Sequence, residues 1–177
     1  MHKDVKKILV DEEEIERRSS ELAKEIDAYY KERGSEPMVI GLLKGSVPFM
    51  MSLVMKMEVD LEIDFMDVSS YDGTNSTEVK VNKDIESSMA GKDVLIVEDI
   101  VDTGKTLDKV VDMFKAKGAK DIKIVTLLDK PSRREKDIEA DYVGFEVPDE
   151  FVIGYGLDYN QKYRNLPYIG VIKEEAI

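Results

Sequence analysis

The chain has 177 residues, 42% of them hydrophobic, and a formal net charge of −12. Such a length suits a single domain spanning residues 1–177 with a core of ordinary size. The negative charge argues against nucleic acid and anionic membranes as partners. The absence of cysteine excludes a disulfide framework and a thiol nucleophile.

Two further absences narrow the class of protein. No apolar run approaches the ~20 residues of a membrane-spanning helix, and the first residues are not followed by an apolar stretch of signal length. We therefore expect a cytoplasmic protein. The only histidine, His2, lies in a terminal segment that we expect to be unanchored. A histidine base and a histidine metal cluster are thereby excluded.

The first predicted element is a helix that begins after Asp11 and ends at Gly34. Asp11 and Glu14 have the spacing of a capping box, which satisfies the first amide groups of a helix. An apolar stripe at helical spacing should face the core. Its members are Ile15, Leu22, Ile26 and Tyr29.

An apolar segment over residues 38–43 predicts a strand, and the turn Lys44-Gly45-Ser46 follows it. Ser46 has the position of a helix N-cap, and Pro48 falls in the first helical turn. Taken alone, this segment is an ordinary connection between a strand and a helix.

A strand with one polar face is predicted next, because apolar and acidic residues alternate over residues 59–65. Such a strand has one exposed face or lies at the edge of its sheet. Residues 69–77 are small and polar except for Tyr71, a composition typical of a surface loop.

The most informative segment begins with a continuous apolar run at residues 94–97. This pattern suits a strand buried on both faces of a parallel sheet. Glu98 and Asp99 then place two carboxylates at the carboxyl end of that strand. Open α/β sheets bind their ligands at this edge.

Residues 102–106, Asp-Thr-Gly-Lys-Thr, predict a tight turn that opens into a helix over residues 105–117. Successive backbone N–H groups and the positive end of the helix form an anion cradle that suits a phosphate. The hydroxyls of Thr103 and Thr106 add donors. A nucleoside triphosphatase loop is disfavoured, because its motif requires a glycine where this chain has Asp99.

The last third of the chain continues the alternation of strands and helices. The apolar run at residues 122–128 predicts a strand that Lys130 closes. Phe151, Ile153 and Tyr155 alternate as one face of a further strand, for which core packing is the default interpretation. The order of elements predicts an α/β fold with a mainly parallel sheet.

Residues 98–106 resemble the phosphoribosyl-pyrophosphate (PRPP) binding motif of the type I phosphoribosyltransferases, in the form typical of the hypoxanthine-guanine phosphoribosyltransferases. The runs at residues 42–46, 127–130 and 151–160 are similar to further motifs of that family. The resemblance implies the type I fold, in which helices flank a central, mainly parallel sheet and a small hood is built from the chain ends. It also implies a mobile lid at about residues 69–82.

The same resemblance implies an activity in purine salvage. The 5-phosphoribosyl group of PRPP is transferred to N9 of hypoxanthine or guanine, which gives IMP or GMP and pyrophosphate. The ribose and 5′-phosphate contacts fall on Glu98, Asp99, Asp102, Thr103, Gly104, Lys105 and Thr106. Asp102 is also implied to take the proton from N7 of the purine.

The resemblance assigns the other end of the substrates to more distant segments. The pyrophosphate contacts fall on Leu43, Lys44, Gly45 and Arg164, and the Leu43–Lys44 peptide bond is implied to be cis. The purine contacts fall on Lys130, Phe151, Val152 and Asp158, with Lys130 donating to O6 and Phe151 stacking on the ring. The lid residues are Ser70 and Tyr71. Mg²⁺ is the implied cofactor, with Glu98, Asp99 and Asp158 as its ligands.

Two alternatives remain open. A regulator that binds PRPP as a signal could keep residues 102–106, but it would not need Lys130, Phe151 and Asp158 together. A transferase acting on xanthine or a pyrimidine is closer, because base choice depends on main-chain geometry near Val152 and Asp158. We expect PRPP and a 6-oxopurine base as partners, and a homodimer or homotetramer.

Overall fold

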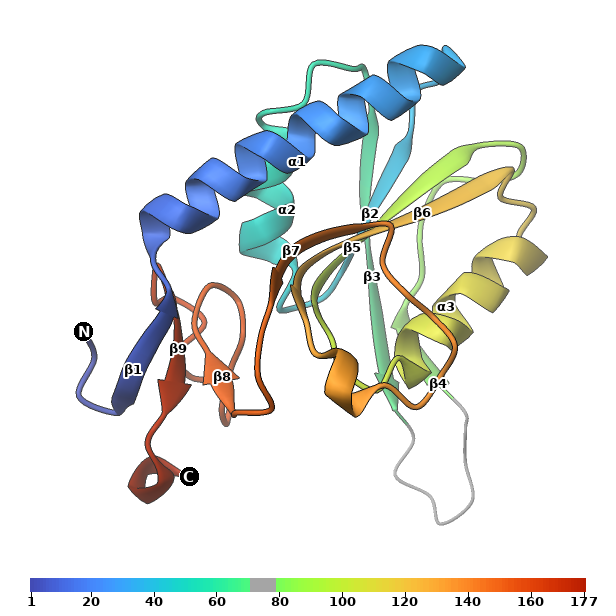
Figure 1. Ribbon diagram of the computed structural model, residues 1–177. Helices are drawn as coiled ribbons and strands as arrows, with labels where there is room; N and C mark the ends of the chain where they lie inside the picture. Colours follow the sequence, from blue (N-terminus) through green and yellow to red (C-terminus); the bar gives the residue numbers. More distant parts are fainter. Residues whose placement is uncertain (71–78) are drawn as a thin grey trace.

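The computed structural model describes residues 1–70 and 79–177, which form two sheets (Figure 1). A six-stranded sheet has the order β4-β3-β2-β5-β6-β7, and a three-stranded sheet has the order β1-β9-β8. Helices α1 and α2 lie together on one face of the larger sheet, and α3 lies on the other (Figure 1). The α/β class with a mainly parallel sheet is therefore confirmed.

The strands of the larger sheet are parallel except for β4, which pairs antiparallel with β3. The central strands β2 and β5 are apolar along most of their length because both of their faces are covered. The strand bounds are β2 Met38–Leu42, β3 Glu62–Ser70, β4 Val79–Lys83, β5 Asp93–Val101, β6 Asp121–Asp129 and β7 Tyr142–Glu146.

Alternate residues of the central strands supply two separate cores. Val39, Leu95 and Val97 pack against α1 (Glu12–Arg33) and α2 (Val47–Val54). The intervening residues pack against α3 (Lys105–Ala116), where Phe114 is fully buried. Full burial of a side chain of this size contributes about 1.5–3 kcal/mol.

Helix α1 begins and ends as the sequence predicts. The Asp11 carboxylate accepts from the amide of Glu14 at 2.8 Å, the Glu14 carboxylate accepts from the amide of Asp11 at 3.0 Å, and Gly34 has a φ of 60°. The predicted apolar stripe faces the core, and Tyr29 at its end packs against the core while only partly buried. Tyr30 is the fully buried aromatic residue, whereas Tyr29 is partly buried and donates through its hydroxyl to Asp121.

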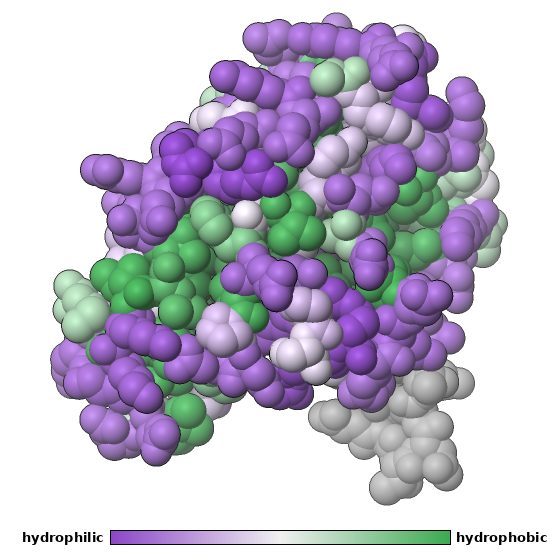
Figure 2. All heavy atoms as spheres, in the orientation of Figure 1, coloured by the Kyte–Doolittle hydropathy of each residue, from purple (hydrophilic) through white to green (hydrophobic). Residues whose placement is uncertain are grey.

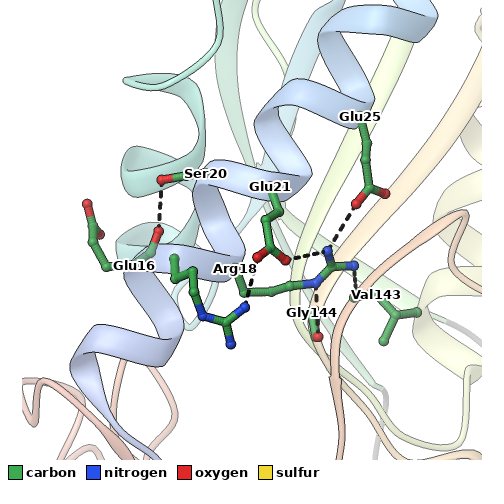
Figure 3. A network of polar contacts seen from close by, with 8 residues as sticks. Glu16, Arg18, Ser20, Glu21, Glu25, Val143 and Gly144 are labelled. Atoms are coloured by element: carbon green, nitrogen blue, oxygen red, sulfur yellow. Dashed lines mark hydrogen bonds and ion pairs between the residues drawn. The ribbon is translucent and has the colours of Figure 1, made fainter.

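A polar network fixes α1 to the outer strand β7 (Figure 3). The Arg18 guanidinium donates to the carbonyl oxygens of Val143, at 2.8 Å, and Gly144, at 3.3 Å. The same side chain pairs with Glu21 and Glu25 on its own helix. Elsewhere the outward face of α1 is covered by hydrophilic side chains (Figure 2).

Strand β3 lies at the edge of its sheet in its first part, which is one of the two arrangements that the alternating pattern predicts. Among the described residues, its first part pairs only with β2, and Ile63 there is 47% exposed. From Asp67 onward the strand also pairs with β4, so only its first part lies at the edge.

The three-stranded sheet is the small hood, and it joins the two chain ends (Figure 1). Its strands β1 (Val5–Val10), β8 (Val152–Ile153) and β9 (Ile169–Ile172) are antiparallel. The expectation of an unanchored His2 is wrong. The amide of His2 donates to the hydroxyl of Tyr168 at 2.7 Å, and its ring packs edge-on against Tyr163.

The predicted strand face through Phe151, Ile153 and Tyr155 is also wrong. Strand β8 contains only Val152 and Ile153, and the chain turns at Gly154, with a φ of 99°, and Tyr155, with a φ of 49°. Phe151 is 48% exposed and does not share the burial of Ile153.

In the described part of the chain, no helix is long and apolar enough to cross a membrane.

Candidate active site

The acid pair lies at the carboxyl end of its strand, where the sequence places it. Strand β5 continues to Val101, so Glu98 and Asp99 occupy its last part, with Glu98 opposite Thr126 of β6. Burial and the neighbouring Asp99 carboxylate raise the pKa of Glu98. Burial also raises the pKa of Asp99, although the amide of Ile100 donates to this carboxylate at 2.8 Å.

The turn at residues 102–106 has the geometry of an anion cradle. Gly104 has a φ of 81°, and helix α3 begins at the next residue, so the first amides of α3 remain unpaired within the helix. These residues line a cavity of about 190 Å³ together with Glu98, Ile100, Val101 and Leu107. The cradle and Glu98 therefore line one cavity.

A second cavity of about 640 Å³ lies beside the first. Both cavities are lined by Ile100 and Asp102, so a ligand with a phosphate at one end and a flat ring at the other could occupy both. The other residues of the larger cavity are Asp99, Lys130, Arg133, Asp149, Glu150, Phe151, Val152, Leu157 and Asp158.

The residues predicted to contact the purine line this larger cavity. Lys130 is 7% exposed, and its ammonium donates to the carbonyl oxygen of Glu150 at 2.6 Å. The Phe151 ring packs edge-on against Tyr159, with 5.5 Å between the ring centroids. One face of Phe151 thus stays open for a flat ligand.

The turn predicted to bind pyrophosphate packs directly against the acid pair. The Leu43–Lys44 peptide bond is cis, as the sequence resemblance implies. A Cβ on Gly45 would lie 1.5 Å from Oδ2 of Asp99, so only glycine fits at this position. Ser46 precedes α2 as predicted, but its buried hydroxyl makes no capping hydrogen bond.

Lys44 and Arg164 meet at one side chain. Both donate to Oε1 of Gln161, Lys44 at 3.4 Å and Arg164 at 3.2 Å. Arg164 also pairs with Asp158 at 2.9 Å and donates to the carbonyl oxygen of Gly156 at 2.7 Å. Two cations from distant segments are thereby brought to the same side of the site.

The acids predicted to bind magnesium do not form a self-sufficient metal site. Among the described residues, no group of three or more histidine, cysteine or acidic side chains could hold a metal ion. Asp99 and Asp158 nevertheless line the same cavity. Mg²⁺ commonly takes one or two carboxylates together with substrate phosphates. The residues therefore fit an ion that the substrate helps to hold.

The predicted lid cannot be placed. Ser70 is the last residue of β3 by its backbone, and Tyr71 lies outside the described residues.

Sequence reasoning missed the segment that covers the phosphate loop. The amides of Glu135 and Lys136 both donate to the carbonyl oxygen of Thr103. Arg134 donates to the carbonyl oxygen of Asp102 at 2.6 Å, and Arg133 pairs with the Asp102 carboxylate at 2.9 Å. The sequence feature that could have revealed this segment is the pair of arginines, Arg133 and Arg134, that follows Lys130.

The comparisons with known proteins agree with this geometry. A family model, phosphoribosyl transferase domain, matches residues 6–160. The hypoxanthine-guanine phosphoribosyltransferase of Bacillus subtilis is 54% identical, over 98% of this chain and 96% of that protein. The chain belongs to the hypoxanthine-guanine phosphoribosyltransferase family. Members of this family are enzymes of purine salvage that use a divalent metal with PRPP.

A longer relative shares the same domain. The bifunctional protein TilS/HprT of Listeria innocua is 55% identical over 99% of this chain. The chain spans 27% of the length of that relative.

Solved structures of the family have the same fold. The hypoxanthine phosphoribosyltransferase of Staphylococcus aureus has a TM-score of 0.95 and 49% identity, with 99% of this chain and 96% of that chain covered. The Trypanosoma cruzi enzyme in complex with its product IMP has a TM-score of 0.95 and 41% identity, with 100% and 99% covered.

Proposed function

We propose that this chain transfers the 5-phosphoribosyl group of PRPP to N9 of hypoxanthine or guanine, producing IMP or GMP and pyrophosphate. The observation that carries the proposal is the pair of cavities that meet at Asp102. One cavity has the amides and hydroxyls for a sugar phosphate, and the other has an aromatic ring and an ammonium group for a purine. The IMP complex of the T. cruzi relative supports this arrangement.

The phosphate end of the substrate rests on residues 102–106 in this proposal. Thr103, Gly104, Lys105 and Thr106 wrap the 5′-phosphate, because the start of α3 supplies unpaired amides and a positive dipole. Glu98 and Asp99 hold the ribose hydroxyls while positive charge develops at C1. Glu98 lines the smaller cavity and Asp99 the adjoining larger one, and these positions support this role.

Asp102 acts as the general base. Its carboxylate faces the larger cavity, between the phosphate loop and the purine residues, and accepts the proton from N7 as N9 attacks C1. Lys130 donates to the purine O6 and draws electron density toward that oxygen. The amino group of adenine would face the Lys130 ammonium, so two hydrogen-bond donors would meet. This supports a preference for a 6-oxopurine.

The leaving pyrophosphate is bound by Leu43, Lys44, Gly45 and Arg164. The guanidinium of Arg164 suits paired phosphate oxygens, and its present partners show that it reaches the same side of the site as Lys44. Asp158, Glu98 and Asp99 would hold Mg²⁺ together with the substrate, and the ion would supply positive charge that stabilises the leaving group.

Base recognition depends on the hood. Phe151 stacks on the purine, and main-chain groups near Val152 and Asp158 meet the base edge. The edge-on contact between Phe151 and Tyr159 supports the stacking position. The lid residues Ser70 and Tyr71 complete the enclosure in this proposal.

The chain acts as a single domain, residues 1–177, in the cytoplasm and assembles into a homodimer or homotetramer. Met51 on α2 is 38% exposed and Met55 directly after it is 78% exposed, and both supply apolar surface for such contacts. Sedimentation of the purified protein would measure the number of copies.

The activity is tested by mixing the protein, PRPP and Mg²⁺ with one base at a time. We expect nucleotide from hypoxanthine and guanine, and little from adenine or uracil. Xanthine is the informative competitor, because its extra oxygen meets the main chain near Val152. Nucleotide from uracil, or none from any base, would contradict the proposal.

A further inference from the structure

An ion pair links the proposed general base, Asp102, to Arg133, a residue without an assigned function in the proposed reaction. Nε of Arg133 lies 2.9 Å from Oδ1 of Asp102, and Nη1 of Arg133 lies 3.4 Å from the carboxylate of Asp149. Arg133 is the last residue of the short helix η1 (Pro131–Arg133), which follows Lys130 directly. The guanidinium therefore spans the wall of the larger cavity, from the phosphate loop to the loop before Phe151.

The two oxygens of Asp102 have different surroundings. Oδ1 is buried and makes no hydrogen bond to another group, so the Arg133 guanidinium is its only charged partner among the described residues. Oδ2 has no hydrogen-bond or ion-pair partner within the described part of the chain. One oxygen is thus engaged, and the other is free to accept a proton.

Removal of Arg133 would leave a buried carboxylate oxygen without a partner. Such an oxygen is unfavourable in the folded protein, and this favours rotation of the carboxylate toward water. A rotation of χ1 or χ2 would move Oδ2 away from the purine N7. A displacement of about 1 Å at a reacting group can reduce the rate on the order of 10²-fold.

We propose that Arg133 is a positioning residue, which holds Oδ1 of Asp102 so that Oδ2 faces N7 of the bound purine. The inference rests on the proposed function, because it assigns the proton transfer to Asp102. The nearby carboxylates of Asp102 and Asp149 raise the pKa of Arg133, so the guanidinium stays charged throughout turnover. Arg134 does not contact the carboxylate of Asp102, because it donates to the backbone carbonyl of that residue and pairs with Asp129.

The test compares kcat and KM in Arg133→Met, Arg133→Lys and the double variant Arg133→Met with Asp102→Asn. We expect Arg133→Met to lower kcat about tenfold, with KM for PRPP changed by less than about twofold. Arg133→Lys should recover part of the loss, because an ammonium can still pair with Oδ1. In the Asp102→Asn background, Arg133→Met should change kcat by less than about twofold, since no base remains to be positioned.

Arg17→Met is the matched control. Arg17 is an arginine on α1 with a 63% exposed side chain paired to Glu21, and its removal should leave kcat unchanged. A thermal midpoint measured for each variant identifies losses that come from misfolding.

The outcomes separate the inference from the proposed function. An unchanged kcat in Arg133→Met, or an equal loss in both backgrounds, overturns the positioning role. The second result would mean that Arg133 acts on the substrate itself. If Asp102→Asn alone keeps the wild-type kcat, the proposed base is wrong whatever Arg133 does.

Discussion

The parallel sheet and the hood contribute to one site through different kinds of structure. Strand β5 carries four fully buried residues, residues 94–97, and then delivers the acid pair and the phosphate loop on regular elements. The hood has a strand of two residues, β8, and four non-glycine residues with positive φ between positions 155 and 163. The residues proposed for the sugar phosphate thus come at the end of a regular strand and the start of a helix, whereas the hood residues proposed for the purine lie on irregular main chain.

The largest effect should come from the point where the two regions meet. Asp102→Asn should lower kcat by about 10²–10⁴-fold, because an amide cannot accept the purine proton. Binding of PRPP should change by about twofold at most, since the phosphate-binding amides remain. Steady-state kinetics together with calorimetric titration of PRPP would measure both quantities. A loss of PRPP affinity equal to the loss of kcat would place Asp102 in binding alone.

The contact between hood and sheet can be broken at one glycine. Gly156 has a φ of 102°, and a Cβ there would lie 1.9 Å from the carbonyl oxygen of Gly45 in the pyrophosphate turn. Gly156→Ala should therefore displace that turn and lower kcat/KM for PRPP on the order of 10²-fold.

Gly34→Ala is the matched control for this substitution. Gly34 also has a positive φ, of 60°, but no atom lies within 4 Å of a Cβ built there. It should destabilise the fold by about 1–2 kcal/mol through backbone strain alone and leave the activity unchanged. Equal activity in the two alanine variants would show that the turn does not depend on the hood.

The purine end should respond separately from the phosphate end. Lys130→Met removes the ammonium that donates to Glu150 and, in our proposal, to the purine O6. A hydrogen bond from a charged group contributes about 1.5–3 kcal/mol, so kcat/KM for hypoxanthine should fall at least about tenfold. KM for PRPP should stay within about twofold. A matching fall in PRPP affinity would contradict the separation of the purine end of the site from its phosphate end.

The smallest effect concerns the stability of the sheet and its dependence on pH. Asp93 at the start of β5 is 4% exposed and forms a two-pronged ion pair with Arg33, at 3.0 and 3.2 Å. The Arg33 guanidinium lowers the pKa of Asp93 in the folded protein. The pair therefore contributes stability above the unfolded pKa of about 3.9, and this contribution is lost as the pH falls through the lower folded value.

Asp93→Asn should accordingly lower the free energy of unfolding by about 1–3 kcal/mol at pH 7. Denaturant unfolding at several pH values would measure the difference between the variant and the parent protein. The difference should shrink as the pH falls below about 4. A difference that stays constant down to pH 2 would mean that the charge of Asp93 contributes nothing, and kcat at pH 7 should be unaffected.

The sheet could be predicted from the sequence in more detail than the hood. Apolar runs such as residues 94–97 and the capping box at Asp11 are local signals, and the structure confirms both. The position of His2 could not be predicted, because its partners Tyr163 and Tyr168 lie at the other end of the chain. The preference for Tyr30 over Tyr29 depends on the rotation of α1 against the sheet, which spacing alone does not fix.

Some features of the candidate site could likewise be predicted from the sequence, and others could not. The cis peptide at Leu43–Lys44 follows from the family resemblance, the turn at residues 102–106 follows from its residue pattern, and both appear in the structure. The short extent of β8 was not predictable, because Phe151 and Ile153 show an ordinary strand alternation and the turn at Tyr155 depends on contacts with Leu166. Arg133 was missed because its partner Asp102 is distant in sequence.

A crystal structure with bound IMP tests the central claim most directly. The account predicts the 5′-phosphate on the amides of residues 103–106, the ribose against Glu98 and Asp99, and the purine between Phe151 and Lys130 with N7 facing Asp102. A nucleotide whose phosphate lies away from residues 103–106, or whose N7 faces away from Asp102, would contradict it.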